Sequence, residues 1–242
     1  EGTKTISADV TVLALGGASW SRLGSDGKWA AHLDGTTPYA PSNAGVTVDW
    51  SPHMTKHFGR PVKATTLRAG DITSRGEWII SKHGLEGGGV YTLPPALRDG
   101  HGLTLDLLPD WNTDKISAAL SKPRGKSTLS NHWRKVLRLD PVRLALLHEF
   151  SNPQSDDFAN EVKALTIPVS GLRPIDEAIS TVGGVALDSL DDTLMLKQSA
   201  GVLCAGEMLD WDAPTGGFLI NGCLATGRFV GLAAAAYAQN GS

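Results

Sequence analysis

One acidic residue at the end of a predicted strand is the first candidate for chemistry in this sequence. Residues 202–205 form a short apolar run that predicts a buried strand, and Gly206 and Glu207 follow it directly. In open α/β sheets, ligands bind beyond the carboxyl ends of the strands. Glu207 therefore stands where a carboxylate can accept hydrogen bonds from the hydroxyl groups of a ligand.

A predicted helix begins after this strand with a pair of glycines. Gly216 and Gly217 precede Phe218 and Asn221, and the helix is expected to span residues 216–239. Backbone N–H groups of glycines are not obstructed by a Cβ, and a helix N-terminus attracts phosphate or another electron-rich group. Asn221, one turn into the helix, either binds a ligand or caps the helix. One acid for hydroxyl groups and one helix end for negative charge indicate a nucleotide cofactor.

A second strand followed by glycines lies near the start of the sequence. Residues 9–15 predict a buried strand, after which come Gly16 and Gly17. Such a pair is either a plain tight turn or a place where backbone approaches a ligand. The next residues, Ala18 and Ser19, also make this stretch similar to the Gly-x-Ser-x-Gly elbow of serine hydrolases. The last glycine of that elbow is absent, so hydrolysis through Ser19 is only the third hypothesis.

Several short motifs, taken in order, resemble those of one group of flavoproteins. They are Asp9-Val-Thr-Val-Leu-Ala-Leu-Gly16-Gly17-Ala18-Ser19, Leu23-Gly24-Ser25-Asp26-Gly27, Lys82-His83-Gly84-Leu85, Thr181-Val182-Gly183-Gly184-Val185 and the segment around Glu207. The first looks like an Ala-Thr-Gly-Gly strand with Leu15 in place of the usual Thr. The sequence thus resembles the NAD(P)/FAD-dependent oxidoreductases that include aminoacetone-oxidase-like and bile-acid-reductase-like flavoproteins.

This resemblance implies an FAD-dependent oxidoreductase that transfers hydride or electrons to or from a small organic substrate, with NAD(P)H as a candidate electron donor. The implied FAD contacts are Gly16, Gly17, Gly206, Glu207, Gly216, Gly217, Phe218 and Asn221. The implied neighbours of the active site are His83, Thr181, Gly183 and Gly184. Backbone donors at the start of the last helix would stabilise negative charge on the reduced flavin. The resemblance assigns no side chain as catalytic acid or base.

One feature of such flavoproteins is missing from the sequence. They begin with a strand, a Gly-x-Gly-x-x-Gly turn and a helix, followed by a ribose-binding acid. The chain starts at Glu1 and reaches its first predicted strand almost at once. We expect that an N-terminal segment of the same protein is absent and acts as a partner of this chain. The alternative is a non-catalytic flavin- or nucleotide-binding module, or half of a larger assembly.

The predicted elements alone indicate α and β content with a terminal α/β unit, and the resemblance implies an α/β fold of the two-dinucleotide-binding-domain flavoprotein type. Residues 1–36 and 165–242 would form a discontinuous, incomplete FAD-binding domain, and residues 37–164 an inserted domain, β-barrel-like and then helical, that covers the substrate. Strands are predicted at residues 46–50, 62–71, 77–81 and 103–108, and helices at 113–120, 129–137, 140–149 and 155–163. Asp140 is the expected N-cap of the third of these helices, with Pro141 at its first position.

Composition limits the remaining possibilities. The chain has 242 residues and a formal net charge of −3, which gives no electrostatic case for nucleic acid. The apolar stretch at residues 205–238 contains Glu207, Asp210, Asp212 and Arg228, so no membrane span is expected.

The histidines and cysteines suggest neither a metal nor a disulfide. His53 and His57 have the i, i+4 spacing of helical metal ligands, but the neighbouring Pro52 and Gly59 favour a loop with solvated imidazoles. No metal site is expected. The two cysteines, Cys204 and Cys223, are expected to be buried thiols of a cytoplasmic protein.

Overall fold

The structure is a computed structural model that describes residues 5–240, and it divides into two compact units. Unit 1 is formed by Glu1–Asn43 and Pro174–Ser242, and unit 2 by Ala44–Arg173. Unit 2 begins and ends at adjacent points, because the backbone N–H of Arg173 donates to the carbonyl of Gly45 at 2.8 Å. The domain boundaries predicted from the sequence lie after residues 36 and 164 instead. The two divisions differ over residues 37–43 and 165–173.

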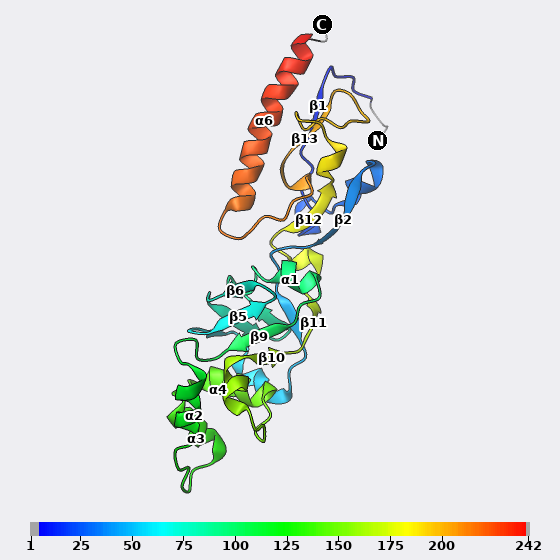
Figure 1. Cartoon of the computed structure of the whole chain (residues 1–242). Helices are drawn as coiled ribbons and strands as arrows, with labels where there is room; N and C mark the ends of the chain where they lie inside the picture. The colour runs from blue at the N-terminus through cyan, green and yellow to red at the C-terminus, as the bar shows by residue number, and fades with distance from the viewer. Residues whose placement is uncertain (1–4, 241–242) are drawn as a thin grey trace. The chain divides into compact units, whose positions relative to one another are not determined.

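Among the described residues, unit 1 contains two small sheets, whose strands are labelled in Figure 1. In one, β1 (Thr11–Leu13) runs parallel to β13 (Val202–Cys204). In the other, β2 (Thr36–Pro41) pairs antiparallel with β12 (Thr181–Val185). Because β1 and β13 are parallel and in register, the carboxyl ends of both strands lie at the same edge of their sheet.

The helix α6 (Phe218–Asn240) lies alongside this parallel pair (Figure 1). Its buried residues Val230 and Ala234 pack with Leu203 and Ala205 at the end of β13. A second cluster of buried side chains lies between the strands and the loops of unit 1 and comprises Val185, Leu190, Leu196, Cys204, Met208 and Leu209. Short 3-10 helices complete unit 1 at Ser21–Leu23, Lys28–His32, Ile175–Glu177, Leu187–Ser189 and Gly206–Met208.

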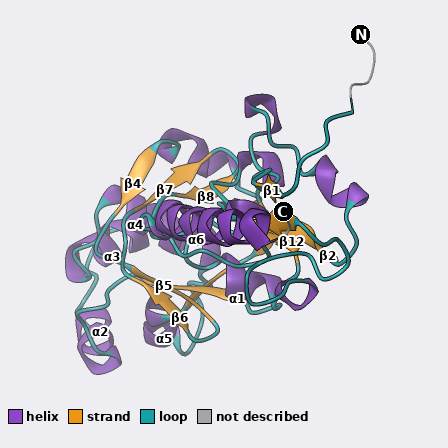
Figure 2. Cartoon of the chain, turned by 90° about the horizontal axis from the view of Figure 1, so that it is seen from above, coloured by secondary structure: helices purple, strands orange, loops and turns teal. Residues whose placement is uncertain are grey.

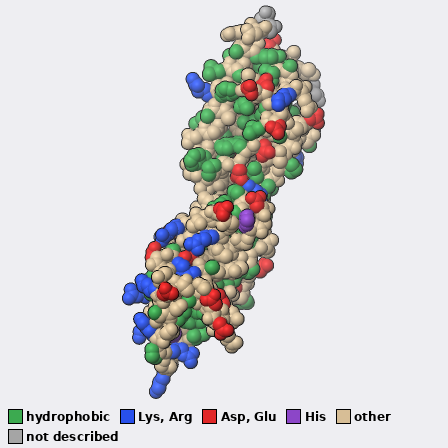
Figure 3. Space-filling model, viewed as in Figure 1, with side chains coloured by type: hydrophobic (Ala, Val, Ile, Leu, Met, Phe, Trp, Pro, Cys, Tyr) green, Lys and Arg blue, Asp and Glu red, His purple; other side chains and the backbone are tan. Residues whose placement is uncertain are grey.

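Most of the surface of α6 is apolar and exposed within unit 1. The large side chains Phe218, Ile220, Leu224, Phe229 and Leu232 are between 48% and 68% exposed. Hydrophobic side chains show over this helix in Figure 3. By length and composition alone, α6 could cross a membrane, since its most apolar 18-residue window has a mean hydropathy of 1.4 and is 11% buried. A single such helix is weak support for a span, and a cytoplasmic protein stays a prediction.

Unit 2 carries two antiparallel sheets among the described residues, and Figure 2 shows β4, β7 and β8 in one group and β5 and β6 in another. The five-stranded sheet has the order β11 (Val169–Leu172), β3 (Val46–Val48), β8 (Gly84–Glu86), β7 (Trp78–Ser81) and β4 (Arg60–Val62). The four-stranded sheet has the order β10 (Leu165–Ile167), β9 (Leu103–Asp106), β5 (Thr66–Ala69) and β6 (Ile72–Ser74).

Unit 2 also contains five α-helices among the described residues, and the largest cluster of buried hydrophobic side chains. The helices are α1 (Pro94–Arg98), α2 (Thr113–Leu120), α3 (Leu129–Val136), α4 (Pro141–Phe150) and α5 (Phe158–Lys163). Asp140 caps α4 as predicted, because its Oδ1 accepts the backbone N–H groups of Val142 and Arg143, each at 2.9 Å. Trp78, Leu67, Leu105 and Leu146 are fully buried between the sheets and helices.

Several predicted elements differ in the structure. The strand predicted at residues 62–71 is two strands, β4 and β5, because Ala64 between them has a left-handed φ of 53°. The helix predicted at 155–163 begins only at Phe158. The loop predicted around His53 is the 3-10 helix Pro52–His57, and His57 is buried rather than solvated, with 8% of its surface exposed.

Candidate functional site

The two glycine-containing strand ends predicted from the sequence meet in unit 1. Gly17 follows β1 and Glu207 follows β13, and the two residues are in close contact. A Cβ on Gly17 would lie 2.9 Å from Oε1 of Glu207 and 2.3 Å from Oγ1 of Thr181. No side chain fits there without displacement, so close packing with these two residues explains the glycine.

Thr181, at the start of β12, forms hydrogen bonds to residues at both strand ends. Its backbone N–H donates to Oε1 of Glu207 at 3.2 Å, and its Oγ1 accepts the backbone N–H of Ala18 at 3.3 Å. Three predicted segments, distant in the sequence, are therefore joined by hydrogen bonds. The carboxylate of Glu207 is held in place by these contacts, and its second oxygen remains an acceptor.

Gly183 and Gly184 lie in β12, close to Thr181, and both positions have a structural reason to be glycine. Both have left-handed backbones, with φ of 100° and 113°, at the point where the register of β12 and β2 shifts. A Cβ on Gly184 would lie 2.2 Å from the carbonyl oxygen of Met208. The N–H of Gly183 donates to Oδ1 of Asp210 at 3.1 Å, so Asp210 joins Gly17, Thr181 and Glu207 in one cluster of contacting residues, although sequence analysis did not predict it as a site residue.

Tyr39 is a member of the cluster that sequence analysis missed. Its hydroxyl donates to the carbonyl of Gly16 at 3.2 Å, and Nε1 of Trp29 donates to the same carbonyl at 3.2 Å. Burial raises the pKa of the Tyr39 phenol well above its usual value, and the negative charges of Glu207 and Asp210 raise it further. The phenol is therefore a stable hydrogen-bond donor that fixes the carbonyl of Gly16.

The end of β13 is tied to α6 through Thr226. Gly206 has a φ of 84°, and its N–H donates to Oγ1 of Thr226 at 3.1 Å. That hydroxyl donates in turn to the carbonyl of Gly222 at 2.8 Å. Burial raises the pKa of the neighbouring Cys223 thiol, and the charge of Glu207 raises it further. The described cysteines are free thiols, and burial raises the pKa of Cys204 to about 11.

The start of α6 has open space around it. Gly216 and Gly217 have φ of 100° and 87°, and a Cβ on either would meet nothing nearer than 4.0 Å. Phe218 and Asn221 after them are exposed, with 58% of Phe218 accessible. The first N–H groups of a helix have no acceptor within it, so they are free to bind an electron-rich group.

The loop that leads to this helix start is anchored within unit 1. The hydroxyl of Ser42 donates to Oδ1 of Asp212, and Nδ2 of Asn43 donates to the carbonyl of Ala213 at 2.8 Å. These side chains follow β2, which sequence analysis did not identify as a strand. The anchor limits the movement of the Gly216–Gly217 turn relative to β2.

His83 belongs to unit 2, whereas the site residues described so far belong to unit 1. It occupies the exposed turn between β7 and β8, where its carbonyl accepts the N–H of Val48 at 3.0 Å. The next residue, Gly84, has no room for a side chain, because a Cβ would lie 1.9 Å from the carbonyl oxygen of Val46. The turn therefore has a structural explanation, and the proximity of His83 to a flavin stays a prediction.

Ser19 has no catalytic partner in the described part of unit 1. His32 is the histidine that the unit 1 sequence contains, and it lines a hollow with Asp34 and Ser189. After Ser19 the chain turns through Trp20, which has a φ of 55°, into the three-residue helix Ser21–Leu23. A nucleophile elbow requires a base and a full helix, so the geometry gives no support to hydrolysis.

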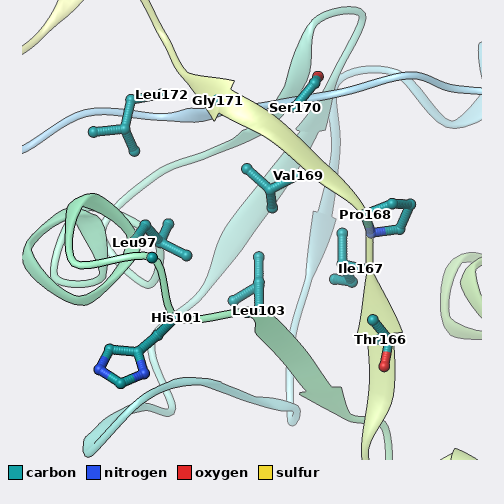
Figure 4. A pocket seen from close by; sticks show the side chains of 12 residues that line it. Leu97, His101, Leu103, Thr166, Ile167, Pro168, Val169, Ser170, Gly171 and Leu172 are labelled. Atoms are coloured by element: carbon teal, nitrogen blue, oxygen red, sulfur yellow. The ribbon is translucent and has the colours of Figure 1, made fainter.

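Unit 2 has a hollow of its own that contains none of the predicted site residues. It has a volume of about 440 Å³ and lies between the end of α1, the start of β9 and the connection from β10 to β11. The side chains of Leu97, Leu103 and Val169 converge on it, and the ring of His101 lies at its edge (Figure 4). Among residues 5–240, no group of three or more His, Cys, Asp or Glu side chains could hold a metal ion.

The chain is similar to known proteins. The HI0933-like protein Rossmann domain family matches residues 1–233. The 3-dehydro-bile acid delta(4,6)-reductase of Clostridium scindens is 26% identical over 255 aligned positions, which cover 94% of this chain but only 62% of that protein. The chain thus spans less than two thirds of the length of this relative. The chain therefore belongs to the HI0933-like Rossmann-domain family, and the resemblance to a family of NAD(P)/FAD-dependent oxidoreductases is confirmed.

Proposed function

We propose that this chain is part of an FAD-dependent oxidoreductase and binds the flavin at the edge where β1 and β13 end. The contact of Gly17 with the Glu207 carboxylate carries this proposal. It puts a fixed hydrogen-bond acceptor at the carboxyl ends of two parallel strands, where α/β folds bind their ligands. A bound flavin would supply the redox chemistry, and the protein would bind and orient it.

The residues present fit such a cofactor. Glu207 would accept hydrogen bonds from ribityl or ribose hydroxyls through the oxygen that Thr181 does not use. The open glycines Gly216 and Gly217 leave space at the start of α6, where backbone N–H groups would stabilise negative charge on the cofactor. Asn221 would present its amide to the same space. The backbone of Gly16 and Gly17, fixed by Tyr39 and Thr181, would form the opposite wall.

The larger arrangement is also a proposal. We infer a discontinuous FAD-binding domain formed by residues 1–36 and 165–242, with residues 37–164 as an inserted domain that selects the substrate. The division of the chain into two compact units supports it, although the bounds of those units are Asn43 and Arg173. We propose a small organic molecule as the substrate and NAD(P)H as the candidate electron donor.

A further α/β segment would complete unit 1. A parallel sheet is normally covered on both faces, yet Val12 in β1 is 43% exposed and α6 shows apolar side chains to solvent. We infer that a segment with a phosphate-binding glycine turn packs on this surface, which would account for the greater length of the reductase relative. Such a segment would reduce the exposure of Ile220, Leu224 and Phe229.

Flavin binding is the experiment that tests this function. The full-length protein should copurify with FAD and show the flavin absorption band at about 450 nm. We expect residues 1–242 alone to bind FAD weakly, and a form of the protein that includes the proposed α/β segment to bind it more tightly. A protein that binds no flavin in either form contradicts the proposal. A protein that binds FAD but is reduced neither by NAD(P)H nor by any organic donor is the non-catalytic module.

A further inference from the structure

A broad groove in unit 2 gathers positive charge. It has a volume of about 880 Å³ and lies between the 3-10 helix Pro52–His57 and β4 on one side and α3 and α4 on the other. Four cationic side chains line it: Lys56, Arg60, Lys63 and Arg134. Figure 3 shows Lys and Arg side chains gathered over the part of unit 2 that carries α2, α3 and α4.

Most of this charge is not neutralised by the protein. Lys63 forms an ion pair with Glu77 at 2.7 Å. Lys56, Arg60 and Arg134 have no carboxylate partner among the described residues. Three like charges around one groove repel each other, and a chain with a net charge of −3 has no general excess of cations that would explain them.

The acid in the groove does not offset these cations, because its charge is already engaged. Asp140 lines the groove, but it accepts the N–H groups of Val142 and Arg143 at the start of α4 and pairs with Nε of Arg143 at 2.6 Å. Partial burial works against its charged form, yet these bonds keep the pKa of Asp140 below its usual value. The field inside the groove is therefore positive.

The rest of the lining suits an organic body rather than a bare ion. Pro61, Val142, Leu144 and Ala145 contribute apolar surface, and Ser130 and Asn131 add neutral hydrogen-bonding groups. Pockets for small molecules have volumes of about 300–1,000 Å³ and combine apolar walls with a few polar groups. Arginine forks match phosphate and carboxylate geometry.

We propose that this groove binds a phosphorylated small molecule of about nucleotide size, with its phosphates at Lys56, Arg60 and Arg134 and its organic body over Val142 and Ala145. Every residue that lines the groove belongs to unit 2, and this proposal does not rest on the proposed flavin site. An extended polyanion such as duplex DNA is disfavoured, because the cations line a single groove rather than a long stripe.

Titration calorimetry with ADP, and with adenosine as the uncharged probe, tests the proposal. The protein should bind ADP and not adenosine. The double variant Lys56→Ser/Arg60→Ser should weaken ADP binding by about tenfold or more, because it removes two charge-assisted contacts to the phosphates, which are stronger than neutral hydrogen bonds. The matched control Lys122→Ser/Arg124→Ser removes the same charge from the exposed connection between α2 and α3 and should bind ADP like the wild type.

Three results would overturn the proposal. One is ADP binding that the groove variant leaves unchanged, which would place the nucleotide elsewhere. Another is an equal loss in the groove and control variants, which would show only a general effect of net charge. The third is binding to anionic phospholipid vesicles or duplex DNA but not to ADP. Arg134→Ser, on α3, should reproduce the loss if the double variant is found by circular dichroism to be misfolded.

Discussion

The carboxylate of Glu207 accepts the backbone N–H of Thr181, with 3.2 Å between Oε1 and the nitrogen, so the acid at the end of β13 is bound to the first residue of β12. Glu207→Ala should remove this acceptor and destabilise the apoprotein by about 1–3 kcal/mol, because the amide loses its charged partner. Flavin affinity should also fall by about tenfold or more. Urea unfolding and a flavin fluorescence titration measure the two effects.

Glu207→Gln is the control, since its amide oxygen can still accept the Thr181 N–H. We expect it to recover most of the stability. If Glu207→Ala binds flavin as tightly as the wild type does, Glu207 is a structural residue and does not contact the cofactor.

Two glycines of unit 1 should respond to the same substitution with opposite signs. Gly17→Ala would put a Cβ 2.3 Å from Oγ1 of Thr181, and we expect a loss of about 1–3 kcal/mol of stability together with weaker flavin binding. Gly231→Ala, on α6, meets nothing within 4 Å and should stabilise the helix by about 0.5–1 kcal/mol. Melting temperatures compare them. Equal effects would mean that the strand ends do not pack as closely as described.

Tyr39 should make unit 1 sensitive to alkaline pH. The folded state keeps the pKa of its phenol above the ordinary value of 10.0, so the unfolded chain releases a proton that the folded chain retains. Stability from this group is complete below about pH 10 and is lost as the pH rises further. Between about pH 9 and about pH 11, the free energy of unfolding should fall less in Tyr39→Phe than in the wild type. A parallel fall in both proteins would contradict the burial of Tyr39.

His57 should make unit 2 sensitive to acid instead. Burial lowers the pKa of its imidazole, and the positive charges of Lys56 and Arg60 lower it further, against the opposing charge of Asp140. Below the ordinary value of 6.5, the unfolded chain gains a proton that the folded chain does not accept, so stability falls with falling pH. His57→Gln should flatten this dependence between about pH 7.5 and about pH 5.5 in urea unfolding. His148 has a pKa lowered by burial and contributes with the same sign, so a partial effect is expected.

Local signals predicted some helices accurately and some strands poorly. The helix predicted at residues 113–120 is α2, because Asn112 caps it with its own side chain at 3.0 Å from the N–H of Lys115. By contrast, β2 was missed, since Thr36–Pro41 contains two prolines and has no alternation of apolar residues. Its partner β12 contains two adjacent glycines that indicate a turn. Strands of this kind are stabilised by pairing over a long sequence distance, which no local pattern reports.

The same reasoning applies to the candidate site. Gly17 and Glu207 could be identified because a glycine or an acid after a buried strand has a general physical meaning. Tyr39 and Thr226 could not, since each acts on a backbone group that is remote in sequence: Gly16 for the phenol and Gly206 for the threonine. One available signal was that Asp210 follows the same strand end as Glu207.

The hydrogen bond between Arg173 and Gly45 has a consequence for how such proteins can diversify. The chain enters and leaves unit 2 at neighbouring residues, and in unit 1 the backbone N–H of Ser42 likewise donates to the carbonyl of Ser180 at 3.0 Å. The residues between these points therefore form an insertion with adjacent ends, here called the cassette. Replacing a cassette with adjacent ends alters loop-closure entropy very little, whatever its length. Exchange of the cassette alone would therefore leave the pairing of β2 with β12 and the contacts within unit 1 in place.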